Sequence, residues 1–89
     1  MEKELFEKLQ LIAEKHGKTS DLQTYVLNGN GMCLNEQERE IKFNHISDKA
    51  GAQQLVEDII CVMKEFHYAA ELVNEQKHTY ILYEYKIRY

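Results

Sequence analysis

The chain has 89 residues, of which 44% are apolar and 29% charged, with 15 acidic against 11 basic side chains. A chain of this size buries enough surface for a single core, so we expect one domain over residues 1–89. The formal net charge of −4, without a Lys/Arg block, argues against non-specific binding to nucleic acid phosphates.

Membrane insertion and disulfide bonding are both disfavoured by the sequence. No apolar run approaches the roughly 18 to 20 residues of a membrane span, and residues 1–4 lack the basic and apolar pattern of a signal peptide. The two cysteines, Cys33 and Cys61, are too few for a disulfide framework. We therefore expect a cytoplasmic protein without a membrane segment.

The first predicted element is a helix over residues 2–16. Its apolar side chains are three and four positions apart, and so line one helical face. Acidic residues in the first turns, with Lys15 and His16 in the last, complement the helix dipole. Gly17 then stands where a left-handed residue commonly ends a helix.

Three strands are expected next. Residues 24–27 are rich in β-branched and aromatic side chains, and the Asn-Gly pairs of 28–31 favour a hairpin that returns through residues 32–34. Ile41 and Phe43 alternate with polar residues in a third strand that ends near residue 46. The first two strands are expected to pair with each other antiparallel.

A second helix is predicted from a cap at Ser47 or Asp48, because a broad apolar stripe runs from Ala52 to Met63. Residues 66–73 allow two interpretations. They can extend this helix to about 27 residues, or they can form a strand that turns at residues 74–77. We favour the strand, because the C-terminal segment needs a pairing partner.

The C-terminal residues 79–89 show the clearest strand pattern, since odd-numbered apolar and tyrosine positions alternate with Leu82, Glu84, Lys86 and Arg88. The predicted fold class is α+β, in the order α-β-β-β-α-β-β. Both helices are expected to cover one face of an antiparallel sheet.

No catalytic, metal or cofactor site is expected. The four histidines (His16, His45, His67 and His78) have no metal-binding spacing among themselves or with the cysteines. A small hydrolase would need a reactive Cys33 beside His45, but Cys33 lies within a predicted strand. The Asn-Gly run precedes a strand, whereas phosphate-binding loops precede helices.

Six tyrosines in a chain without tryptophan indicate a protein interface, because tyrosine suits surfaces that become buried on association. We predict a small non-catalytic binding protein, an inhibitor or regulator of the kind carried by phages and other mobile elements. Its partner would be a protein or a second copy forming a homodimer, docked by the C-terminal strand or the sheet face opposite the helices. The alternative is a single-stranded nucleic acid-binding domain that uses the sheet tyrosines. The predicted contact residues are Tyr68, Tyr80, Leu82, Glu84, Lys86, Arg88 and Tyr89.

Overall fold

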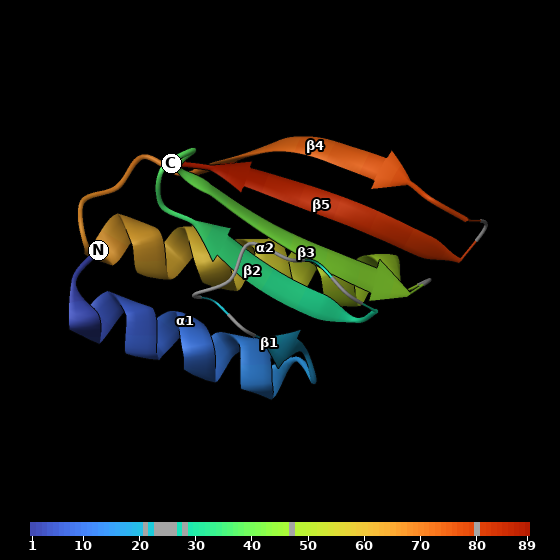
Figure 1. Cartoon of the computed structure of the whole chain (residues 1–89), viewed down its shortest axis with the longest axis horizontal. Helices are drawn as coiled ribbons and strands as arrows, with labels where there is room; N and C mark the ends of the chain where they lie inside the picture. Colours follow the sequence, from blue (N-terminus) through green and yellow to red (C-terminus); the bar gives the residue numbers. More distant parts are fainter. Residues whose placement is uncertain (21, 23–26, 28, 47, 80) are drawn as a thin grey trace.

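The computed structural model describes residues 1–20, 22, 27, 29–46, 48–79 and 81–89. Its elements are α1 (Lys3–Lys15), β1 (Thr19–Ser20), β2 (Gly31–Asn35), β3 (Glu40–Ile46), α2 (Lys49–Glu65), β4 (Glu71–Lys77) and β5 (Leu82–Arg88). The strands form one sheet in the order β1-β2-β3-β5-β4, and both helices pack on the same face of it (Figure 1). The predicted α+β class, with two helices on one sheet face, is confirmed.

The core forms between this face of the sheet and the two helices. The helices contribute Leu5, Leu9, Ala52, Leu55 and Ile59, none of which is exposed to solvent. Alternate residues of β3 and β5 meet them, because Phe43 lies opposite Tyr85 and Ile41 lies opposite Ile87 in the antiparallel register. The Phe43 and Tyr85 rings stack with centroids 5.0 Å apart. The odd-numbered residues of β5, which the sequence alternation groups on one face, therefore lie on the helix side of the sheet.

The helix boundaries follow their local signals. Gly17 has a φ of 66° directly after the last turn of α1, and Lys18 N–H donates to the Ala13 carbonyl over a distance of 2.9 Å. Asp48 caps α2 by accepting a hydrogen bond from Gly51 N–H at 3.1 Å. At the other end, His67 takes a φ of 68°, which stops α2 and excludes the long helix as an interpretation of residues 66–73.

The sequence pattern places the strand that follows α2 too early, since the observed β4 is Glu71–Lys77. The predicted turn at residues 74–77 is wrong, since these residues belong to β4, and the chain reverses between Lys77 and Leu82. The Thr79 hydroxyl oxygen builds this reversal by accepting hydrogen bonds from the N–H groups of Ile81 and Leu82. Residues 74–77 are polar because both faces of the outermost strand are exposed. A polar composition of this kind also suits a turn.

The first predicted hairpin strand lies mostly outside the described residues, since 24–26 are not among them. Leu27 is not in a strand. The strand that pairs with β2 at this edge is instead the two-residue β1. Thr19 and Ser20 lie opposite Gly31 and Met32, in the same order, so β1 runs parallel to β2. The sheet thus has four longer antiparallel strands and a short parallel addition at one edge.

Candidate protein-binding surface

The structure separates the predicted contact residues into two groups. Leu82, Glu84, Lys86 and Arg88 lie along β5 on the sheet face opposite the helices, whereas Tyr68 and Tyr89 meet each other at the end of the sheet. Tyr80 lies outside the described residues.

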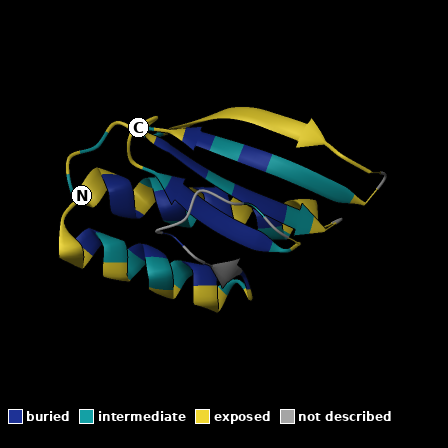
Figure 2. Ribbon diagram, in the orientation of Figure 1, coloured by how far each residue is buried: buried dark blue, intermediate teal, exposed yellow. Residues whose placement is uncertain are grey.

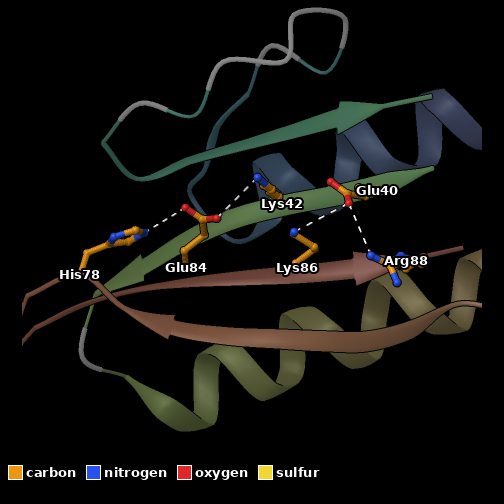
Figure 3. Close-up of polar contacts among 6 residues, drawn as sticks. All are labelled: Glu40, Lys42, His78, Glu84, Lys86 and Arg88. Carbon is orange, nitrogen blue, oxygen red and sulfur yellow. Dashed lines mark hydrogen bonds and ion pairs between the residues drawn. The ribbon is translucent and has the colours of Figure 1, made fainter. Parts of the chain in front are cut away.

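The β5 group takes part in a ladder of ion pairs with β3 (Figure 3). Glu84 lies between His78, at 2.9 Å, and Lys42, at 3.8 Å. Glu40 lies in the same way between Lys86, at 3.7 Å, and Arg88, at 3.8 Å.

This ladder resolves a conflict in the strand register. Lys42 lies directly opposite Lys86, an arrangement that destabilises a sheet when nothing compensates for it. Each lysine instead reaches a glutamate on the other strand, one step along the diagonal. Both lysines on this face are therefore paired with a carboxylate within the chain.

The exposed apolar patch expected on this face is largely missing from the described residues. Its exposed apolar part is the cross-strand pair of Ile46, 50% exposed, and the half-buried Leu82. Among the described residues here there is also no tyrosine or phenylalanine, which the nucleic acid alternative requires for base stacking.

The second group, Tyr68 and Tyr89, ties distant segments together. Their rings form an edge-to-face pair with centroids 5.4 Å apart, and the Arg39 guanidinium lies 5.6 Å from the centroid of the Tyr89 ring. Arg39 Nε also donates to the Tyr89 carbonyl oxygen at 2.8 Å. Burial, followed by the charge of Glu36, raises the pKa of Tyr89 to about 12. Both tyrosines therefore contribute packing within the chain.

One edge of the sheet is β4, because β5 pairs with β3 on one side and with β4 on the other. The main chain of β5 is thus already used, and the predicted docking by this strand's backbone is not available. All seven residues of β4 are exposed (Figure 2), including Leu72 at 40% and Val73 at 37%. A bulge between Leu72 and Asn74 interrupts the pairing of β4 with β5.

An apolar groove lies beside the start of β4. It has a volume of about 510 Å³ and runs between the last turns of α2 and the segment that leads into the strand. Its lining residues are Ile60, Lys64, His67, Tyr68, Ala69 and Ala70. We use "the β4 surface" for this groove together with residues 71–77. Of the residues of this surface, only Tyr68 was among the predicted contacts. The sequence feature that could have revealed the surface is the apolar pair of Leu72 and Val73 within a polar stretch.

A buried lysine forms a separate polar cluster beside the last residues of β3. Lys18 is 6% exposed, and its Nζ donates to Asn30 Oδ1 at 2.7 Å and to the backbone carbonyl of Asn44. The same Nζ lies 2.9 Å from His45 Nδ1. Burial lowers the pKa of Lys18 to about 8, and burial together with the Lys18 charge lowers the pKa of His45.

The hydrolase alternative requires Cys33 and His45 to meet, and the strand register separates them. Cys33 pairs with Lys42 and faces away from the helices, whereas His45 shares the helix-side face of β3 with Phe43. Burial raises the pKa of the Cys33 thiol to about 11, which keeps it protonated at neutral pH.

Within the described ranges, no three His, Cys, Asp or Glu residues are arranged to hold a metal ion. Neither α1 nor α2 combines the length and the apolar character that crossing a bilayer requires. A comparison with known proteins finds no matching family model, curated protein or solved structure.

Proposed function

We propose that this chain is a non-catalytic protein-binding module and that the β4 surface is its docking site. The observation that carries the proposal is an edge strand whose every residue is exposed, next to an apolar groove. An added strand can hydrogen-bond to such an edge while one of its side chains enters the groove. The partner is a protein segment, from another protein or from a second copy.

The composition of β4 supports selective binding. Edge strands commonly carry charges and bulges, which prevent indiscriminate pairing with other strands. Here the charges are Glu71, Glu75 and Lys77, and the bulge lies at Leu72/Asn74. A partner must therefore complement both the charge pattern and the exposed apolar pair, and this requirement provides specificity.

We assign the module a regulatory or inhibitory role, of the type found among accessory proteins of phages and mobile elements. Small acidic domains that act by contact alone commonly have such roles, and the net charge of −4 fits this class. Two free thiols, Cys33 and Cys61, support action in a reducing compartment such as the cytoplasm.

Photo-crosslinking in the cells of origin tests the docking site. A benzoylphenylalanine is placed at Leu72 or Val73 on β4, and at Leu11 as a control, because Leu11 is 63% exposed on α1. We expect a discrete adduct from the β4 positions and none from Leu11. An adduct of twice the 10.6 kDa monomer mass identifies a second copy, and any other mass identifies a different protein. Equal labelling at all three positions, or no adduct, contradicts the proposal.

A further inference from the structure

We infer that the partner at β4 is a second copy of this chain, paired antiparallel around a two-fold axis at Gln76. This inference rests on the proposed function, because it uses the same edge. Figure 1 shows β4 as the outermost strand of the sheet, with none of the labelled helices or strands beyond it. A strand of the second copy can therefore approach along its length.

The register with β5 determines which β4 side chains share a face. Glu75 and Lys77 lie opposite Tyr85 and Tyr83, and so project toward the helix side of the sheet. Asn74 and Gln76 lie opposite Lys86 and Glu84, and so project toward the other side. Directly opposed residues of an antiparallel pair project to the same side, and a two-fold axis places one residue opposite itself.

Three registers are centred on residues 75–77, the part of β4 that pairs regularly beyond the bulge, and the charges distinguish them. An axis at Glu75 places this carboxylate opposite its own copy, and an axis at Lys77 does the same with the ammonium group. Like charges in directly opposed positions destabilise a sheet. An axis at Gln76 instead places Glu75 opposite Lys77 of the second copy, and the two-fold symmetry repeats this favourable pair.

The same register extends the pairing on both sides of Gln76. It places Asn74 of one copy opposite His78 of the other. The bulge between Leu72 and Asn74 interrupts the regular strand just beyond this point and so falls at the edge of the contact.

Sedimentation equilibrium of charge variants over a concentration series tests the inference. The wild type should dimerise, and Glu75→Lys or Lys77→Glu alone should weaken dimerisation at least about tenfold, because each variant replaces two attractive pairs by two repulsive ones. An equimolar mixture of the two variants should form a heterodimer with near wild-type affinity, since one chain then has lysine at both positions and the other has glutamate at both. The double variant Glu75→Lys/Lys77→Glu should form a homodimer, because exchanging the two charges keeps every opposed pair attractive.

Two matched controls separate this pairing from a general effect of charge. Glu57→Lys and Lys49→Glu, at exposed positions of α2, make the same charge changes and should leave the affinity within about twofold. A monomeric wild type, or a mixture that does not recover dimerisation, overturns the inference. If Leu72 then still crosslinks to a different protein, the proposed function stands and only the identity of the partner is wrong. If no position on β4 gives an adduct, the proposed function falls as well.

Discussion

The buried ammonium of Lys18 gives the protein an unusual dependence of stability on pH. The perturbation is Lys18→Met, which keeps the length and most of the volume of the side chain but removes its charge. In the wild type the pKa of Lys18 falls to about 8 on folding, from 10.5 in the unfolded chain. Between these values the unfolded chain binds more protons than the folded chain, so raising the pH favours folding.

The magnitude follows from the two pKa values. Between pH 7 and pH 9 the folded state releases most of the Lys18 proton, while the unfolded state keeps nearly all of it. Proton linkage then increases the free energy of unfolding by about 1 kcal/mol over this interval. The Met variant lacks this increase. The N-terminal amine acts in the opposite sense, because its hydrogen bond to Glu36 raises its pKa. It is present in both proteins, however, and cancels in their difference.

Urea unfolding of the two proteins at pH 7, 8 and 9, followed by circular dichroism, measures the effect. We expect the stability of the wild type relative to the Met variant to rise by about 1 kcal/mol across the series. Burial raises the pKa of the Cys33 thiol from 9.0 to about 11, so this thiol lowers the stability of both proteins as the pH approaches 9 and likewise cancels in their difference. A difference that stays constant or shrinks as the pH rises would refute the argument that burial destabilises the Lys18 ammonium.

Three further predictions concern the sheet and the start of α2. Tyr85→Ala should lower the free energy of unfolding by about 3 kcal/mol or more in urea titrations, because the side chain is 4% exposed and stacks on Phe43; a loss below about 1 kcal/mol would contradict its place in the core. Glu84→Gln should cost about 1 kcal/mol at low ionic strength and much less in about 1 M NaCl, because His78 and Lys42 share this carboxylate. A salt-independent loss, or an equal loss in Glu57→Gln, would exclude this electrostatic cause. Gly51→Ala should not raise the melting temperature, because displacement of the capping Asp48 carboxylate by the new Cβ offsets the roughly 1 kcal/mol that alanine gains over glycine inside a helix. A melting temperature raised by several degrees would show that the cap adjusts at no cost.

Local and periodic signals were sufficient for the class of the fold. The alternation around Ile87 groups on one face the residues of β5 that the structure buries, because a strand covered on one side only must separate its apolar and polar residues. Gly17 and Asp48 likewise mark the helix ends, since both act through their own backbone and its nearest neighbours.

The errors and omissions involve the sheet edge and contacts between distant residues. The sequence predicts a turn at residues 74–77 because an edge strand exposed on both faces has the polar composition of a loop. The burial of Lys18 had no sequence signal, since its partners Asn44 and His45 are more than 25 positions away. The pairing of Tyr68 with Tyr89 is equally non-local. The residue type predicts both tyrosines as interface contacts, because tyrosine suits surfaces that become buried on association, but only the tertiary fold shows that they pack on each other.

The position of β5 between β3 and β4 sets the order in which the sheet can be assembled. Within the sheet β4 pairs only with β5, so it cannot be joined to the other strands before residues 82–88 are in place. The β4–β5 hairpin is closed by a short turn and costs little loop entropy, whereas the pairing of β3 with β5 spans all of α2. We therefore expect the hairpin to form first and dock on β3 as a unit. Until it docks, the edge of β3 with Ile41 and Phe43 is open to pairing with other chains, so the docking step is where folding and aggregation compete.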